Sequence, residues 1–208
     1  SEADYYAMDP AALEAYLDSP KGKSVKAVIP VHLHGQMADM PAISLIAKKR
    51  GIKVIEDSAQ AHGARLGGKG PGAFADIATY SFYPGKNIGA FGDAGAITTD
   101  DPQLYRECKM LVNHGRWKAK YEHEIEGYNM RLDSIQAAVL RIKLRHIDGW
   151  TRERRARAEE YLRLLPGKPG IEAPRVRQGS EPVWHVFPIR VRDRDAVTAR
   201  LRATDWLG

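Results

Sequence analysis

The sequence predicts an α/β protein in which a mostly parallel β-sheet is flanked by helices. The main observation is a strand, helix, strand order at Val25–Val31, Pro41–Lys49 and Ile52–Ile55. These segments fit within about forty residues, a length that favours a right-handed crossover between parallel strands. Two further apolar runs, at 77–83 and 94–99, supply more strands for the same sheet.

The helices of the first half are predicted from their end signals. A helix from Pro10 to about Leu17 follows an aspartate that serves as its N-cap. Pro41 opens the second helix, which ends before Gly51. A third helix follows Asp101, because this residue and the proline after it repeat the signal of the first helix.

The second half is predicted to contain two helices and a strand. Asp133 and Gln136 resemble a capping box, and apolar residues then repeat with helical spacing up to Gly149. A second helical stretch covers 151–165, and Val183–Val191 alternates as a strand does.

Composition excludes several classes of protein. The chain has 208 residues, of which 43% are hydrophobic and 28% charged, and these values are ordinary for a globular protein. No apolar run approaches the roughly 18 residues of a membrane-spanning helix, and the first residues lack the features of a signal peptide. The single cysteine agrees with a reducing compartment, so we expect a cytoplasmic protein.

The positive charge raises a nucleic-acid alternative. The formal net charge is +6, and segment 141–163 holds twice as many basic as acidic residues. The basic residues alternate with Leu and Ile at helical spacing, as on the solvated side of an amphipathic helix. A solvated helix face is therefore preferred to a nucleic-acid surface.

Asp57 is the first candidate for chemistry, because it directly follows the strand Ile52–Ile55. Ligands of open α/β sheets collect at the carboxyl ends of strands, so this carboxylate would face a ligand. The alternative is that Asp57 only caps a following helix.

Lys86 is the second candidate, since a predicted strand passes there into a glycine-rich loop. A lysine in an apolar loop can attack a carbonyl group and form a Schiff base. The alternative is an ordinary exposed lysine in a turn. The loop lacks the spacing of a nucleotide-binding P-loop, because Asn87 follows the lysine.

His32 and His34 raise the possibility of a metal pair. They alternate at the predicted strand end and would point the same way, but no third ligand is apparent nearby. Packing, or a role in a pocket wall, is the preferred interpretation, and no metal site is predicted.

Several longer motifs occur in a fixed order along the chain. They are Val31-His-Leu-His-Gly-Gln36, Val54-Ile-Glu-Asp-Ser-Ala-Gln-Ala-His-Gly63, Ser81-Phe-Tyr-Pro-Gly-Lys-Asn87, Asn113-His-Gly115 and Gly127-Tyr-Asn-Met-Arg-Leu-Asp-Ser-Ile-Gln-Ala-Ala138. Together they closely resemble the DegT/DnrJ/EryC1/StrS family of pyridoxal-phosphate sugar aminotransferases. The resemblance covers about 25–191 and implies a fold type I aminotransferase-like architecture.

The resemblance implies a role for each of five residues. Lys86 matches the catalytic lysine that holds pyridoxal 5'-phosphate as an internal aldimine and moves the proton during transfer. Asp57 matches the carboxylate on the pyridine nitrogen, and Gln60 matches the residue near the ring and its 3-oxygen. Ser81 matches a donor to the cofactor phosphate, and Asn129 matches an amide that reaches the phosphate of a neighbouring subunit.

The implied reaction is transfer of an amino group, with glutamate as donor, to a keto group of a nucleotide-linked deoxysugar. If Asn129 acts across an interface, the protein is a homodimer with shared active sites. Relatives with histidine at the lysine position act as sugar dehydratases, so Lys86 favours transamination. The alternatives are a dehydratase and a non-catalytic or truncated relative with a structural or regulatory role.

The resemblance also predicts the domain organisation. Residues 1–148 are expected to form part of a large cofactor-binding domain, 149–169 an inter-domain helix, and 170–208 the start of a small α+β domain. Segment 170–180 is rich in Gly, Pro and Arg, as a connection between domains would be. Nothing in 1–23 matches the family's glycine-threonine phosphate loop, so a central fragment whose pocket lacks one wall is expected.

Overall fold

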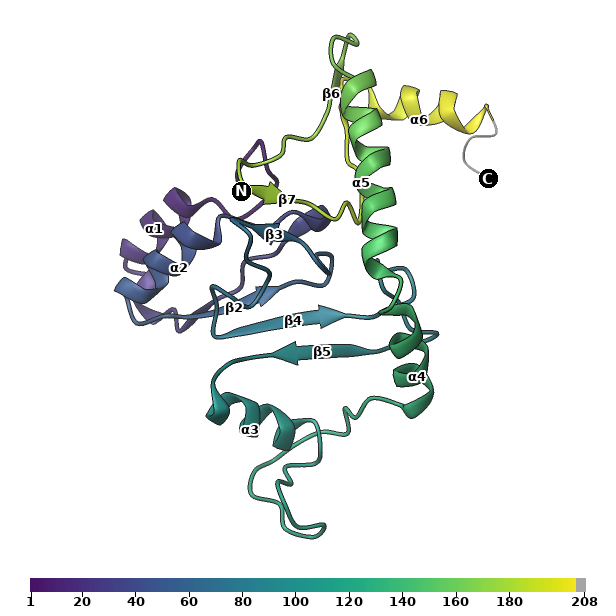
Figure 1. Ribbon diagram of the computed structural model, residues 1–208. Coiled ribbons are helices and arrows are strands. Elements are labelled where there is room, and N and C mark those ends of the chain that lie inside the picture. Colours follow the sequence, from purple (N-terminus) through teal and green to yellow (C-terminus); the bar gives the residue numbers. More distant parts are fainter. Residues whose placement is uncertain (205–208) are drawn as a thin grey trace.

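A four-stranded mixed sheet forms the centre of the protein (Figure 1). The structure is a computed structural model that describes residues 1–204. The strand order is β1-β2-β4-β5; the first three strands run parallel, and β5 is antiparallel to β4. Their bounds are Ala27–Val28, Lys53–Asp57, Ile77–Ser81 and Gly95–Thr98. The predicted α/β class with a mostly parallel sheet is confirmed.

The first strand is much shorter than predicted. Only Ala27–Val28 form β1 within the predicted Val25–Val31, and Val31 adds a single parallel bridge to Asp57. Pro30 lies between them and has no N–H to donate, so a continuous ladder cannot form there.

Aspartate N-caps start three of the helices beside the sheet. Asp9, Asp39 and Asp101 each accept backbone N–H groups at the first turns of α1, α2 and α3. These helices span Pro10–Asp18, Met40–Lys49 and Pro102–Leu111, close to the predicted bounds. The core between α2 and the sheet includes Met37, Met40 and Ile43, which are fully buried.

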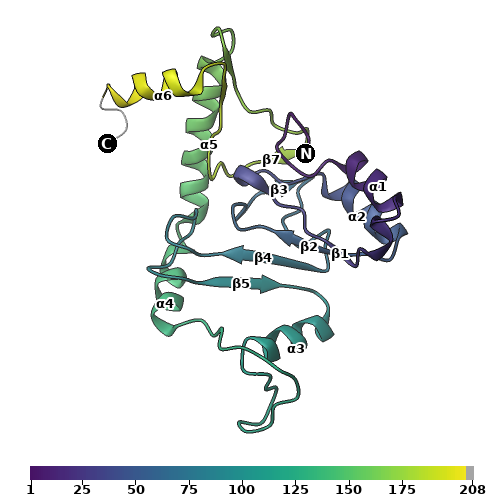
Figure 2. The same cartoon turned by 180° about the vertical axis from the view of Figure 1, so that it is seen from behind.

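Helices α4 and α5 stack end to end along one side of the sheet in both views (Figures 1 and 2). α4 spans Ser134–Lys143 and α5 spans Ile147–Leu164. The predicted break at Gly149 is wrong, because the chain turns at 144–146, where His146 N–H donates to the Lys143 carbonyl, and Gly149 lies inside α5.

The predicted capping box at the start of α4 is also wrong. The Asp133 side chain accepts no cap hydrogen bond, and Gln136 Oε1 instead accepts the N–H of Phe91 at 2.8 Å. Gln136 therefore joins α4 to the loop after β4. Lys143 Nζ makes a second such link, donating to the Gly89 carbonyl at 2.6 Å.

Short strands dominate the last part of the described chain. β6 (Ile171–Glu172) pairs with β8 (Arg190–Val191), and β7 (Ser180–Glu181) pairs with β3 (Arg65–Leu66). α6 spans Arg194–Arg202, and two 3-10 turns, η1 and η2, span Gly22–Ser24 and Leu33–Gly35. The domain division at 148/149 and 169/170 stays a prediction, and residues 205–208 of its last part lie outside the described residues.

The predicted strand Val183–Val191 is wrong except at its end. Between 182 and 189 the chain is irregular, with Trp184 at φ +47 and prolines at both ends. The backbone instead bonds to η2, since Val183 N–H donates to the Gly35 carbonyl and His185 N–H to that of His34, at 2.9 and 3.0 Å.

Gly35 makes this contact possible. Its φ is +95, and a Cβ there would lie 2.9 Å from both His185 N and Trp184 N. A side chain would therefore strain the backbone and also separate η2 from segment 183–185.

We predict that Gly35→Ala lowers the free energy of unfolding by about 3 kcal/mol, from left-handed strain plus overpacking. The matched control is Gly51→Ala, whose φ is +62 but whose Cβ would meet nothing within 4 Å. Gly51→Ala should lower the free energy of unfolding only through left-handed backbone strain, by about 1 kcal/mol. Urea unfolding measures both variants, and equal losses would contradict the packing argument.

Candidate active site

The candidate site lies where parallel strands end. Asp57 is the last residue of β2 and Ser81 the last residue of β4, and Val31 after β1 bridges to Asp57. Because parallel strands place their carboxyl ends on one edge, the loops that follow β1, β2 and β4 share that edge. The structure thereby gathers the segments that carry Asp57, Gln60, Ser81 and Lys86.

Backbone bonds on both sides fix Asp57. Its N–H donates to the Pro30 carbonyl, and its carbonyl accepts the N–H of His32, both at 3.0 Å. Its half-buried carboxylate accepts the N–H of Ala59 through Oδ1 at 3.0 Å. Within residues 1–204, Oδ2 has no hydrogen-bond partner and stays available to a ligand.

Asp57 does not cap a helix, because no helix forms after it. Residues 58–64 are a series of tight turns, in which Ala61 N–H donates to the Ser58 carbonyl. Gln60 is therefore placed by another contact, its Oε1 accepting the N–H of His34 at 2.6 Å. This contact leaves its Nε2 hydrogens free to donate.

The two histidines after β1 do not point the same way. The expected alternation fails because His34 lies in η2 with φ +60, which turns the chain. His32 is fully buried, with Nε2 2.9 Å from Glu56 Oε2, while its Nδ1 accepts the N–H of Ala38. Nε2 therefore carries the proton and donates to Glu56.

The structure also bears on metal binding. In the part of the chain that the structure describes, no group of three or more His, Cys, Asp or Glu is placed to hold a metal ion.

The loop after β4 holds Lys86 half-buried. Ser81 Oγ accepts the N–H of Tyr83 at 3.3 Å, and the Lys86 N–H donates to the Tyr83 carbonyl at 2.9 Å. Gly89 lets the loop fold on itself, because a Cβ there would lie 2.4 Å from the Pro84 carbonyl oxygen. No described carboxylate lies within ion-pair distance of Lys86 Nζ.

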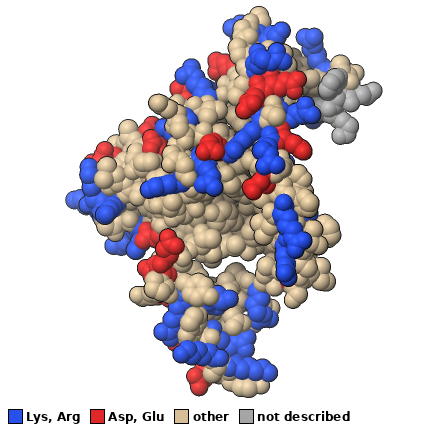
Figure 3. Space-filling model, viewed as in Figure 1, with Lys and Arg blue, Asp and Glu red and all other residues tan. Residues whose placement is uncertain are grey.

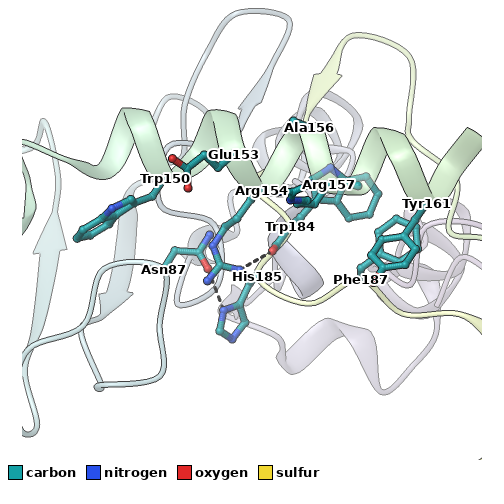
Figure 4. A pocket seen from close by; sticks show the side chains of 11 residues that line it. Asn87, Trp150, Glu153, Arg154, Ala156, Arg157, Tyr161, Trp184, His185 and Phe187 are labelled. Carbon is teal, nitrogen blue, oxygen red and sulfur yellow. Dashed lines mark hydrogen bonds between the residues drawn. The ribbon is translucent and has the colours of Figure 1, made fainter. Parts of the chain in front are cut away.

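Sequence reasoning assigned no role to Asn87 and His185, which the structure places at the same site. Asn87 is buried, donates to the Val183 carbonyl at 3.0 Å, and lies 3.0 Å from His185 Nδ1 through its Oδ1. Both residues line a hollow of about 740 Å³ beneath α5, together with Trp150, Arg154 and Phe187 (Figure 4). Asn87 ends the motif Ser81–Asn87 and His185 lies in the predicted strand Val183–Val191, and neither segment indicates this pairing.

His62 lies beside the same loop with an unusual environment. It is 5% exposed, neither ring nitrogen has a hydrogen-bond partner among residues 1–204, and its ring lies against those of Tyr80 and Phe82. Burial is the largest cause that lowers its pKa to about 4. The charges of Lys86 and His185 also lower the pKa of His62, whereas the Ser81 carbonyl raises it.

Asn129 lies apart from the other predicted site residues. It is exposed and forms an isolated antiparallel bridge with Asn113, beyond the end of α3. The structure therefore does not bring it together with Asp57 and Lys86 within one chain.

Charged residues are distributed unevenly over the surface. Figure 3 shows Lys and Arg over α5 and the lower part of the molecule, with Asp and Glu interspersed near α5 and a largely uncharged area between. Within the described residues, no helix is long and apolar enough to cross a membrane.

We predict that stability falls as the pH drops from 6.5 toward 4. Over this interval the unfolded state protonates His62 while the folded state does not, because its folded pKa is about 4 against 6.5. The loss is of order 3 kcal/mol, since each pKa unit corresponds to about 1.4 kcal/mol.

His62→Phe tests this prediction, because phenylalanine fits between Tyr80 and Phe82 and cannot be protonated. We expect urea unfolding of this variant to show most of that pH dependence removed. His146→Phe, at an exposed position, is the control and should keep the dependence. An unchanged pH dependence in His62→Phe would contradict the prediction.

Comparison with known proteins shows what this arrangement is similar to. Residues 1–205 match the DegT/DnrJ/EryC1/StrS aminotransferase family, a wider span than the 25–191 expected from the motifs. The dTDP-3-amino-3,4,6-trideoxy-alpha-D-glucose transaminase of Streptomyces venezuelae is 46% identical over 96% of this chain and 52% of its own length. A pleiotropic regulatory protein of Geobacillus stearothermophilus is 47% identical over 94% of this chain and 52% of its own.

Solved structures agree with this result. S. venezuelae DesV, determined with a ketimine intermediate, matches with TM-score 0.92 and 46% identity over 98% of this chain and 53% of that one. NtdA from Bacillus subtilis, with bound cofactor PMP, matches with TM-score 0.86 and 33% identity over all of this chain and 46% of that one.

The chain thus spans about half the length of the curated relatives it matches. The resemblance drawn from the ordered motifs and the predicted fold type are both confirmed. The chain belongs to the DegT/DnrJ/EryC1/StrS aminotransferase family.

Proposed function

We propose that the protein transfers an amino group, taken from glutamate, to a keto group of a nucleotide-linked deoxysugar. The observation that carries this proposal is the common sheet edge on which the segments of Asp57 and Lys86 lie. Relatives named as dTDP-sugar and UDP-sugar aminotransferases support the substrate class. Glutamate as donor comes from the family resemblance.

Pyridoxal 5'-phosphate is the cofactor of this family, and the residues present fit it. Asp57 offers a carboxylate oxygen without a partner, and Lys86 offers an amine without an ion pair among residues 1–204. Gln60 offers an amide N–H, because its oxygen is already occupied by His34. The bound cofactor supplies an electron sink for the electrons left when a C–H bond breaks.

Each side chain has a distinct task in this proposal. Asp57 keeps a proton on the pyridine nitrogen, because a negative charge against that atom favours its protonated form. With the cofactor bound, Lys86 Nζ would serve as the general base and acid that takes up and returns the proton of the reacting carbon. Ser81 and Gln60 are neutral donors that orient the phosphate and the ring oxygen.

A homodimer with shared active sites completes the proposal. Asn129 is exposed and its backbone bridges to Asn113, which leaves its amide accessible to the phosphate site of a partner subunit. The single cysteine, Cys108, is a free thiol, which agrees with the cytoplasm as the place of the reaction.

A regulatory role is the second candidate, because one similar protein is named a pleiotropic regulatory protein. A non-catalytic role needs no reactive lysine, whereas an aminotransferase does. The dehydratase alternative is disfavoured by Lys86 itself. Labelling of this lysine therefore separates the candidates.

We predict that borohydride reduction in the presence of pyridoxal phosphate attaches the cofactor to Lys86. Peptide mass mapping of the full-length gene product locates the label, and Lys86→Arg should remove it. Lys143→Arg is the control, because Lys143 donates to the Gly89 carbonyl and has no proposed role in catalysis. Label confined to other lysines would overturn the proposal.

We predict that mixing two inactive variants restores activity if Asn129 acts across the interface. A dimer of one Lys86→Ala chain and one Asn129→Ala chain contains one site in which both residues are intact. About a quarter of the wild-type activity is expected, because half of the dimers are mixed and each has one intact site. Activity no higher than the sum of the unmixed variants would contradict shared sites.

A further inference from the structure

His185 and Asn87 form a pair in which the amide fixes the proton position of the imidazole. Asn87 Nδ2 donates to the Val183 carbonyl at 3.0 Å, so the nitrogen and oxygen of this amide cannot be exchanged without facing two oxygens toward each other. Asn87 Oδ1 is then the atom 3.0 Å from His185 Nδ1. An oxygen acceptor at that distance requires a proton on Nδ1.

The other ring nitrogen is consequently an acceptor. With the proton on Nδ1, neutral His185 carries a lone pair on Nε2, which has no hydrogen-bond partner among residues 1–204. The half-buried ring lines the hollow beneath α5 (Figure 4). Figure 4 shows Nδ1 toward Asn87 and the other ring nitrogen turned away from α5, so the fold fixes the direction of this acceptor.

The groups around His185 keep it neutral. Burial is the largest cause that lowers its pKa, and the nearby charges of Lys86, Arg154 and His34 lower it further. Arg154 is itself held on this wall, since it donates to the Trp184 carbonyl at 3.1 Å. At neutral pH the ring therefore accepts a hydrogen bond and does not repel nearby cations.

We propose that His185 Nε2 accepts a hydrogen bond from a sugar hydroxyl next to the reacting carbon, with Asn87 as its positioning residue. This inference rests on the proposed function. Asn87, whose side chain lies 3.0 Å from His185 Nδ1, directly follows Lys86 in the chain, so the loop that carries this lysine also holds the imidazole. A neutral hydroxyl fits the site better than a phosphate, because an unprotonated nitrogen has no hydrogen to donate to an anion.

The first test measures the tautomer directly. Nitrogen-15 NMR of histidine-labelled protein reports the protonation of each ring nitrogen, and His185→Gln assigns the signal. At neutral pH we expect Nδ1 to be protonated and Nε2 unprotonated, with Asn87→Ala reducing this preference. A wild-type His185 protonated on Nε2 would overturn the inference without any activity measurement.

The second test measures substrate recognition in the full-length enzyme. The probe is dTDP-3-amino-3,6-dideoxy-alpha-D-galactopyranose, the sugar named for one relative, used as amino donor in the reverse direction. Its amino-bearing carbon is flanked by carbons that carry hydroxyls. We expect His185→Phe to raise KM for this sugar about tenfold, by loss of one hydrogen bond, with a smaller effect on kcat.

Two further variants and a second amino donor distinguish a failure of the His185 role from a failure of the proposed function. His185→Gln keeps an acceptor and should recover most of the affinity, and exposed His146→Phe is the control for the histidine change. The KM for glutamate should rise less than that for the sugar. Equal rises for both donors would overturn the role of His185, whereas a wild-type protein inert toward glutamate would overturn the proposed function.

Discussion

The parallel register of β1, β2 and β4 is the constraint on which the candidate site depends. Asp57 is paired with Thr79 in this register, so its side chain lies on one face of β2 and that of Glu56 on the other. Glu56 is fully buried against His32, whereas Asp57 is half-buried. A slip of one residue would exchange the two carboxylates and bury Asp57, the one proposed to contact the cofactor.

A second contact joins the sheet edge to residues far along the chain. The backbone of 183–185 bonds to His34 and Gly35, and Asn87 reaches the same segment from the loop after β4. The Arg154 side chain on α5 donates to the Trp184 carbonyl in the same segment. The wall that carries His185 is therefore held by three separate parts of the fold, which explains how a segment without regular secondary structure can hold a defined position.

Much of this arrangement could be predicted from local sequence signals. Aspartate followed directly or one residue later by proline indicates the starts of α1, α2 and α3, and ordered motifs indicated the family. Two of the failures depend on a partner distant in sequence or on one backbone angle. Gln136 accepts the N–H of Phe91 and so does not form the predicted capping box. His34 adopts a positive φ, so His32 and His34 do not alternate as residues of a strand would. The tautomer of His185 depends on Asn87, ninety-eight positions away, so no local pattern reveals it.

In our proposal, one sheet edge brings Asp57 and Lys86 to the same cofactor. A crystal structure of the full-length gene product grown with pyridoxal phosphate tests this claim most directly. We expect density continuous with Lys86 Nζ and a hydrogen bond between the Asp57 carboxylate and the pyridine nitrogen. A cofactor bound away from this edge, or with its ring nitrogen turned from Asp57, would contradict it.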